Sequence, residues 1–169
     1  PTQITALDTA DIVAMSGSQL GAMTTSQVTA LSPNLVSAIE TGDLSSLTTT
    51  QLAALYTEQV EALGTAQVAA LSTTQFAAFS ATQLGSFTSE SVAALTTEQA
   101  ASLTTAQVQG FTATQMGALE TQDLNALTTA TLQALDADQI TALSTAQVAA
   151  LQTGQLAALT TGQVQALDV

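Results

Sequence analysis

The sequence predicts an all-α solenoid of very short helices, with one helix in each eight-residue repeat and two or three repeats in each superhelical turn. Three observations predict this fold. A period of eight runs without insertion or deletion from residue 8 to residue 167, apolar residues recur three positions apart in every block, and helix-capping residues open most blocks. A fixed short period is typical of stacked repeat architectures.

The repeat array covers the whole chain as a single domain, residues 1–169. It contains twenty full octads in residues 8–167, a truncated octad in 1–7 and the start of another at Asp168 and Val169. The fifth and eighth positions are always apolar and vary only in size, with Ala100 as the smallest residue. The seventh is Ala in sixteen of the twenty octads. The fourth position is Gln in fourteen octads, and the first is Ser, Thr or Asp in fifteen. We therefore expect positions five, seven and eight to face a core, and positions three and six to face water.

Helix is favoured over strand because positions five and eight would point to opposite faces of a strand. In a helix, residues three or four apart share a face. Ala, Leu and Gln are also good helix formers. Each octad is therefore predicted to hold one helix.

The start of each octad resembles a capping box, in which a Ser or Thr side chain accepts from a backbone N–H and a Gln three residues later reaches back. The segments Ser16–Gln19 and Thr104–Gln107 fit this pattern. Pro1 and Pro33 both occupy the second position, the first helical residue, where proline is favoured because its missing N–H has no helical partner.

A single continuous helix is excluded by the period. Eight residues at about 100° each turn the chain about 80° past two full turns, so an apolar stripe would wind around the rod. Short isolated helices are unstable in water and persist only when they pack on neighbours. Stacked octads are the remaining solution, and the sequence leaves open whether two or three make a turn.

Composition excludes several classes of function. The 169 residues contain no Lys, Arg, His or Cys and carry a formal charge of −13, so we expect no nucleic-acid binding and no binding to anionic membranes. Ser and Thr have no His or Lys to activate them, and we expect no catalytic residue, no cofactor and no small-molecule substrate.

Paired carboxylates within octads are interpreted as helix caps and solvated groups, because two carboxylates fall short of the six to eight oxygens that Ca²⁺ takes. Weak cation binding is left open, and no metal ligand is assigned. The pairs are Asp8 with Asp11, Glu40 with Asp43, Glu58 with Glu61, Glu120 with Asp123, and Asp136 with Asp138.

The octad in the form Leu-Thr-Thr-x-Gln-Val-x-Ala, as in Leu103-Thr-Thr-Ala-Gln-Val-Gln109, resembles repeat tracts of very large bacterial secreted or surface proteins. Those proteins are described as adhesin-like, RTX-like or "haem utilisation or adhesion" proteins. The resemblance implies an extracellular or cell-surface structural region. A haem role has no support in this chain, which lacks the His and Cys that would serve as axial ligands.

The expected function is that of a structural repeat segment, a rigid spacer, stalk or filament-forming solenoid of a large extracellular bacterial protein. The alternative is an adhesive surface that binds ice or a polysaccharide through a ladder of Thr side chains. Residues 1–7 and 160–167 look like ordinary repeats and not like polar caps. We therefore expect end-to-end self-association of copies or continuation into a longer array.

Overall fold

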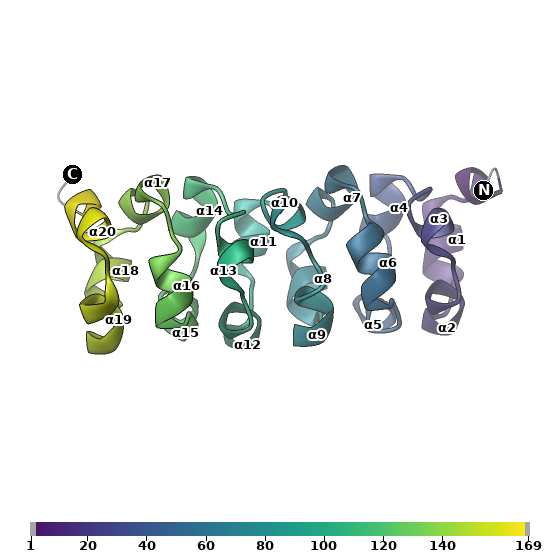
Figure 1. The fold of residues 1–169 in the computed structure, drawn as a ribbon. Coiled ribbons are helices and arrows are strands. Elements are labelled where there is room, and N and C mark those ends of the chain that lie inside the picture. Colours follow the sequence, from purple (N-terminus) through teal and green to yellow (C-terminus); the bar gives the residue numbers. More distant parts are fainter. Residues whose placement is uncertain (1–2, 168–169) are drawn as a thin grey trace.

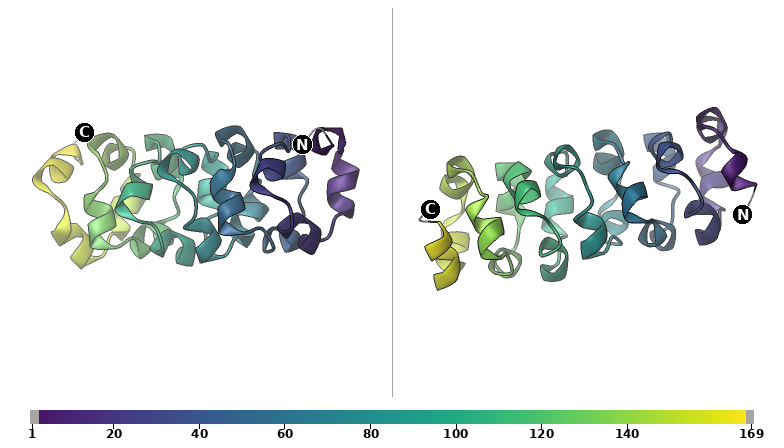
Figure 2. Two further views of the ribbon diagram at one scale, coloured as in Figure 1. Left: turned by 45° about the vertical axis from the view of Figure 1, so that its right-hand side comes forward. Right: turned by 90° about the horizontal axis from the view of Figure 1, so that it is seen from above.

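The protein is a rod of short helices laid side by side, with the two ends of the chain at opposite ends of the rod (Figures 1 and 2). The computed structural model describes residues 3–167. Within this range the chain forms one 3₁₀ turn, Ile4–Ala6, followed by twenty α-helices of four to six residues and no strand. Asp168, Val169 and Pro1, which the octad pattern includes, lie outside the described residues.

Each full octad contains one helix. In chain order they are α1 (Thr9–Ala14), α2 (Gly17–Gly21), α3 (Thr25–Val28), α4 (Pro33–Ser37), α5 (Thr41–Leu44), α6 (Thr49–Ala54), α7 (Thr57–Glu61), α8 (Thr65–Ala70), α9 (Thr73–Phe76), α10 (Ala81–Leu84), α11 (Ser89–Ala93), α12 (Thr97–Ala101), α13 (Thr105–Val108), α14 (Ala113–Ala118), α15 (Thr121–Ala126), α16 (Thr129–Gln133), α17 (Ala137–Thr141), α18 (Thr145–Ala150), α19 (Thr153–Ala158) and α20 (Thr161–Ala166).

Every helix starts at the second position of its octad, after a first residue in extended conformation that acts as N-cap. At α13, for example, the Thr104 side chain accepts from the backbone N–H of Gln107, and the Gln107 side chain accepts from the backbone N–H of Thr104. Pro33 is the first residue of α4, as predicted. No residue in 3–167 has a positive φ, so the chain turns between octads through ordinary extended residues and needs no glycine there.

The helices stack with a separation of three octads. Each helix from α1 to α17 packs on the helix three places further along the chain. The predicted solenoid of short helices is confirmed, and the choice left open between two and three octads per turn is resolved at three. Along the lower edge of the rod in Figure 1, α2 and α5 are followed by α9 and α12, so successive helices on that edge are three or four octads apart in the chain.

The core follows positions five and eight. The fifth residue is at most 2 % exposed in every octad from Ile12 to Ile140, and the eighth is buried from Met23 to Leu143. Three aromatic rings pack together in this core: the Phe79 and Phe87 ring centroids lie 5.5 Å apart, and each ring also contacts Phe76. Position three is exposed throughout the full octads, as expected.

One expectation about the core needs correction, and one buried position was not predicted. The seventh residue is half-buried or exposed in every octad and never fully buried, while the fourth residue is buried in every octad from Gln51 onward. The seventh residue packs tightly on the previous turn, because a Cβ added to Gly110 would overlap the backbone of Ala81, the second residue of the octad three places earlier. The carbonyl oxygen of Gly110 also lies against the sixth residue of that octad, where a Cβ added to Gly85 would lie 2.5 Å from it. Side chains at the fifth and eighth positions form the core, and the small seventh residue lets successive turns approach each other closely.

Candidate functional site

The most regular polar arrangement in the molecule is a buried glutamine at the fourth position of the octad. Gln99 is 1 % exposed. Its Oε1 accepts from the backbone N–H of Thr96 at 2.9 Å, which completes the cap of its own helix. Its Nε2 donates to the carbonyl oxygens of Val68 and Leu71, both at 2.8 Å, four octads earlier in the chain. We call this set of contacts the glutamine clamp.

The clamp recurs in every octad from Thr48 onward in which the fourth residue is Gln. In each case Oε1 accepts from the N-cap backbone, and Nε2 donates to carbonyl oxygens 28 residues and 30 or 31 residues earlier. The clamp residues are Gln51, Gln59, Gln67, Gln75, Gln83, Gln99, Gln107, Gln115, Gln139, Gln147, Gln155 and Gln163.

The clamp solves a problem of short helices. The last carbonyl groups of any helix have no partner within that helix, and burying them unpaired costs about 1–3 kcal/mol each. A helix of four to six residues consists largely of such ends. The clamp gives the eighth-residue carbonyl a donor from the next turn. It adds a second donor to the fifth-residue carbonyl, which already accepts from the backbone N–H of the eighth residue, as Val68 does from Leu71 at 3.2 Å.

The capping box predicted from the sequence accounts for the hydrogen bond that Oε1 accepts. The two hydrogen bonds that Nε2 donates were not predicted. The capping box explains an acceptor at the fourth position, which Asp or Glu supplies as well. The preference for Gln in fourteen of twenty octads is the signal that a donor is also required. An amide carries an acceptor and a donor on two separate atoms at its end, whereas a carboxylate carries acceptors alone.

Two octads replace the glutamine by a hydroxyl residue. The Ser91 Oγ donates to the carbonyl oxygen of Leu63 at 3.1 Å, and the Thr131 Oγ1 donates to that of Leu103 at 3.3 Å. Both residues are buried, and both keep the contact to the eighth position of the octad four places earlier. These departures from the repeat therefore weaken the clamp without removing it.

In a third octad Asp123 replaces the clamp glutamine, and this replacement leaves a buried polar atom unpaired. It is fully buried at the fourth position of its octad. Its Oδ1 accepts from the Thr97 hydroxyl at 2.9 Å, and its Oδ2 has no partner within the described chain. Burial raises the pKa of Asp123 above its ordinary value of 3.8, and the nearby charges of Glu120 and Glu98 raise it further against the opposing effect of the Thr97 hydrogen bond.

Two of the other carboxylate pairs include residues whose side chains cap a helix. Asp8 and Asp11 form a reciprocal capping box, with each carboxylate accepting from the backbone N–H of the other residue at 3.0 Å. Asp136 accepts from the backbone N–H of Gln139 at 2.8 Å. Among residues 3–167 no group of three or more acidic side chains is placed to hold a metal ion.

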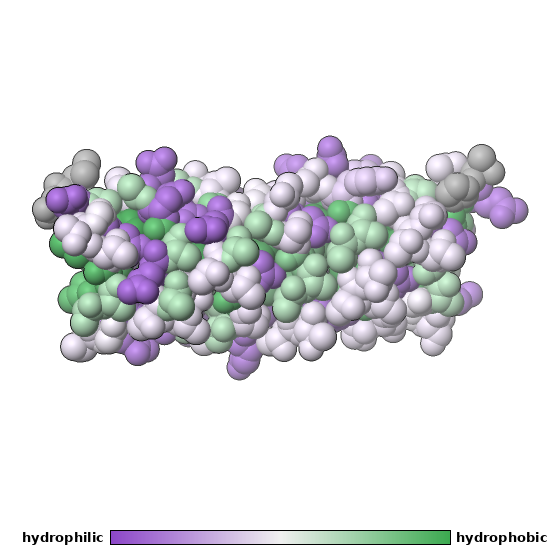
Figure 3. Space-filling model, viewed as in Figure 1, coloured by the Kyte–Doolittle hydropathy of each residue, from purple (hydrophilic) through white to green (hydrophobic). Residues whose placement is uncertain are grey.

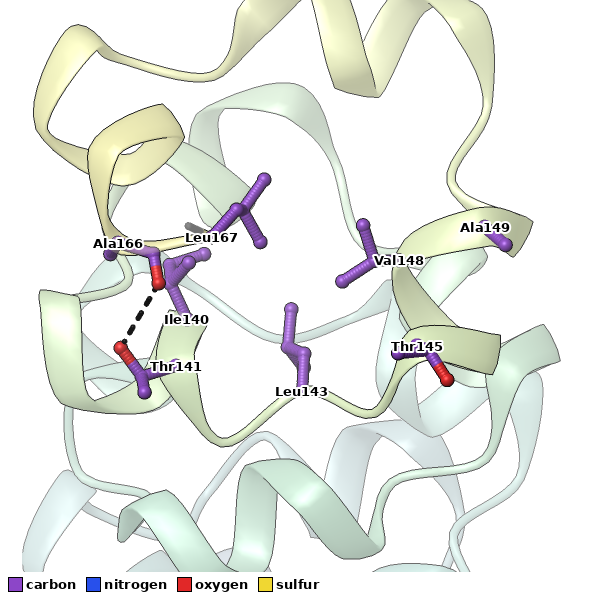
Figure 4. A pocket seen from close by; sticks show the side chains of 8 residues that line it. All are labelled: Ile140, Thr141, Leu143, Thr145, Val148, Ala149, Ala166 and Leu167. Atoms are coloured by element: carbon purple, nitrogen blue, oxygen red, sulfur yellow. Dashed lines mark hydrogen bonds between the residues drawn. The ribbon is translucent and has the colours of Figure 1, made fainter. Parts of the chain in front are cut away.

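A hollow of about 300 Å³ opens near the C-terminal end of the described chain, between α17, α18 and α20. Apolar side chains of Ile140, Leu143, Val148 and Leu167 point into it (Figure 4). Its polar contact joins the Thr141 hydroxyl to the carbonyl oxygen of Ala166 at 3.3 Å. No titratable side chain lines this hollow, so its walls supply apolar surface and no acid or base.

The fold and its internal hydrogen bonds define a tandem-repeat protein of the α-solenoid class, with a structural repeat as its building unit. The chain belongs to the ALTTAQ repeat family, which matches residues 2–35, 36–73, 69–105, 116–153 and 142–169. No curated protein matches the chain. No helix within residues 3–167 has the length and apolar character needed to cross a membrane.

Replacing a clamp amide by a carboxylate tests the donor half of the contact. We expect Gln99→Glu to lower the free energy of unfolding at neutral pH by about 2–4 kcal/mol, because a buried carboxylate then faces the carbonyls of Val68 and Leu71. Burial against these acceptors raises the pKa of the new carboxyl, so most of the loss disappears as the pH falls and the group is protonated. Urea denaturation across this pH range measures the effect.

The matched control is Gln19→Glu. Gln19 is exposed, and its Oε1 accepts from the backbone N–H of Ser16 at 2.8 Å, a contact that a carboxylate retains. We expect a change within about 0.5 kcal/mol. Equal losses for the two variants would contradict a donor role for Nε2.

The raised pKa of Asp123 predicts a second effect of pH on the stability of the fold. Its pKa is raised in the folded state, so its stabilising contribution is complete below the ordinary value of 3.8 and is lost as the pH rises through the folded-state pKa. We expect Asp123→Gln to be more stable than the parent by about 1–3 kcal/mol at neutral pH, because the unpaired carboxylate is replaced by a clamp amide. The difference should shrink on acidification. A pH-independent difference in denaturation midpoints would refute this account.

Proposed function

We propose that the chain is a structural repeat segment, a rigid spacer or stalk in a large extracellular bacterial protein. One observation carries the proposal. Helices three octads apart pack on one another from α1 to α20, and the clamp joins octads four apart from Gln51 to Gln163. A rod built from identical contacts has a length set by the number of its octads, and this property is what a spacer requires.

Charge and surface composition support this role. Thirteen acidic residues and no basic ones give every copy the same sign, which keeps parallel rods apart in solution. Space-filling atoms on the face shown in Figure 3 are mostly of intermediate hydropathy, with scattered hydrophilic groups. The departures from the octad at Leu35, Ser91, Ala100 and Thr131 are all buried, so they do not form an exposed binding surface.

The proposal includes no catalytic step and no cofactor. Most Ser and Thr residues are the first or second residue of an octad, where the hydroxyls of Thr48, Ser80 and Thr160 accept from backbone N–H groups of their helices. A nucleophilic hydroxyl needs an adjacent base to activate it, and the chain contains no His or Lys.

Removing whole octads tests the spacer function. We expect deletion of residues 48–71, three octads, to leave a folded rod that is shorter by one helix layer, about 8–10 Å. The join places Ser72 after Leu47, and Gln75 then faces the carbonyls of Leu20 and Met23 in the ordinary clamp register. Small-angle X-ray scattering measures the length, and circular dichroism measures the helix content.

The control is deletion of residues 48–67, which removes two and a half octads. It shifts the apolar and clamp positions out of register, so we expect loss of cooperative folding. The spacer proposal fails if the three-octad deletion unfolds as well, or if scattering shows the parent chain to be flexible.

An adhesive function is a second candidate, favoured by one line of threonines. The second residue of the octad is Thr in every third octad from α3 to α18, along a line that passes from the front of the rod at α3 and α6 to its lower edge at α9 and α12 (Figure 1). These residues are Thr25, Thr49, Thr73, Thr97, Thr121 and Thr145. All six are exposed, and their helices pack on one another in sequence from α3 to α18. A shallow hollow between α6 and α9 includes Thr49, Thr50 and Thr74.

Ice binding through this line predicts thermal hysteresis and shaped ice crystals at high protein concentration. Thr49→Lys combined with Thr73→Lys should abolish both. The matched control, Thr57→Lys with Thr114→Lys, changes threonines of α7 and α14, two helices at the upper edge of the rod in Figure 1, and should leave both intact. Absence of hysteresis in the parent chain excludes ice as the target.

A further inference from the structure

Two adjacent octads in the interior of the rod lack the full clamp. The octads on either side of them each accept two amide hydrogen bonds from a glutamine four octads later. The octad of residues 88–95 accepts none from the corresponding residue, and the octad of residues 96–103 accepts a single hydroxyl hydrogen bond. The corresponding residues lie in the octads of residues 120–135. We call the contact between residues 88–103 and residues 120–135 the joint.

The joint connects α11 and α12 to α15 and α16, and α12 and α15 are neighbours along the lower edge of the rod (Figure 1). Further octads pack on it from both directions, so its irregularity follows from its own residues and not from where the chain begins or ends. The residues that depart from the octad here are Ala100, Asp123 and Thr131. Ala100 is the smallest residue at the fifth position, so the joint also has less apolar surface to bury.

Asp123 occupies the position from which a glutamine would reach the carbonyl of Leu95, 28 residues earlier. A shorter side chain reaches the equivalent carbonyl elsewhere, since the Ser91 Oγ lies 3.1 Å from the carbonyl oxygen of Leu63. Asp123 is fully buried, and its Oδ1 accepts at 2.9 Å from the hydroxyl of Thr97, two residues beyond Leu95, so the carboxyl points to this turn. Its Oδ2 has no partner within residues 3–167.

The protonation state of Asp123 decides whether this octad has a donor for the clamp. An ionised carboxylate carries acceptors alone, and so does the backbone carbonyl of Leu95 that the register places beside it. Buried acceptors that face each other without a donor between them destabilise the folded state. A proton on Oδ2 supplies the missing donor, because the carboxyl O–H can donate to the carbonyl oxygen while Oδ1 still accepts from Thr97.

We propose that the joint is a proton-operated latch. With a proton on Asp123, the carboxyl closes the contact to Leu95 that an amide makes in the ordinary octads. Without that proton, the joint is the first part of the interior of the rod to open. The inference goes beyond the spacer function, because it concerns how the rod opens and holds whatever the rod connects.

The surroundings of Asp123 favour the protonated form. Burial raises the pKa of Asp123, the Thr97 hydrogen bond opposes this effect, and the charges of Glu120 on the same octad and Glu98 on α12 raise the pKa further. Glu90 on α11 is exposed, and α18, which packs on the other side of α15, has no titratable residue. The chain contains no Lys, Arg or His to stabilise the carboxylate. The latch is therefore fully closed below the ordinary pKa of 3.8 and opens as the pH rises through the folded-state pKa.

Hydrogen exchange of the full chain, followed by mass spectrometry, tests the latch. Peptides from residues 88–103 and 120–135 report on the joint, and peptides from residues 72–87, whose two octads accept amide hydrogen bonds from Gln107 and Gln115, are the internal control. Protection factors correct for the intrinsic effect of pH on exchange. We expect them to rise about tenfold in the joint between neutral pH and about pH 4, the effect of a pKa raised by about one unit, and to stay nearly constant in residues 72–87.

Four variants assign the response to Asp123. Asp123→Asn carries a permanent donor of the same shape, so we expect the joint to be protected already at neutral pH and to lose its pH response. Glu98→Gln removes a neighbouring negative charge and should move the midpoint of the response to lower pH. Thr97→Val removes a hydrogen bond that stabilises the carboxylate and should move the midpoint to higher pH. The matched control Asp138→Asn changes an exposed carboxyl outside the joint and should leave the midpoint unchanged.

A joint whose protection does not rise on acidification overturns the proposal, and so does an Asp123→Asn variant that keeps the pH response. An equal rise in residues 72–87 would show a general effect of acid on the array and would also overturn it. Midpoints that move in the same direction in Glu98→Gln and Thr97→Val would contradict the assignment to Asp123. None of these results bears on the spacer function, which the octad deletions test separately.

Discussion

The fold depends on one buried amide in each octad. A helix of four to six residues cannot satisfy its own carbonyl groups, and a rod made only of such helices would bury many unpaired acceptors. The glutamine clamp supplies a donor from the next turn and caps its own helix with the same side chain, as Gln99 does for Thr96, Val68 and Leu71. Apolar burial at positions five and eight drives the stacking, and the clamp makes that burial compatible with polar backbone.

The period, the helical state and the capping of each octad could be predicted from the sequence because these are local properties. The fifth and eighth positions share one face of a helix, and Pro33 and the Thr104–Gln107 box mark helix starts. Three octads per turn and the burial of the fourth position could not be predicted. Both depend on contacts between residues 24 to 31 apart, and a repeat in which every octad is alike does not distinguish one such separation from another.

The irregular octads show how much variation the clamp tolerates. Ser91 and Thr131 donate through a hydroxyl to one carbonyl each, and the octads around them keep the ordinary packing. Asp123 is different, because its second carboxylate oxygen is buried without a partner and its pKa is raised. A repeat array spreads its stability over many similar contacts between neighbours, so a single weakened octad is supported by the turns on both sides.

The direction of the clamp has a consequence for how the chain is made. The Nε2 of each clamp glutamine donates to carbonyls 28 to 31 residues nearer the N-terminus and never to residues that follow. A chain that emerges from the ribosome therefore presents each new octad to acceptors that already exist. Folding can advance one octad at a time behind the growing end, without waiting for a distant partner, and the separation that must be closed stays the same however long the array becomes.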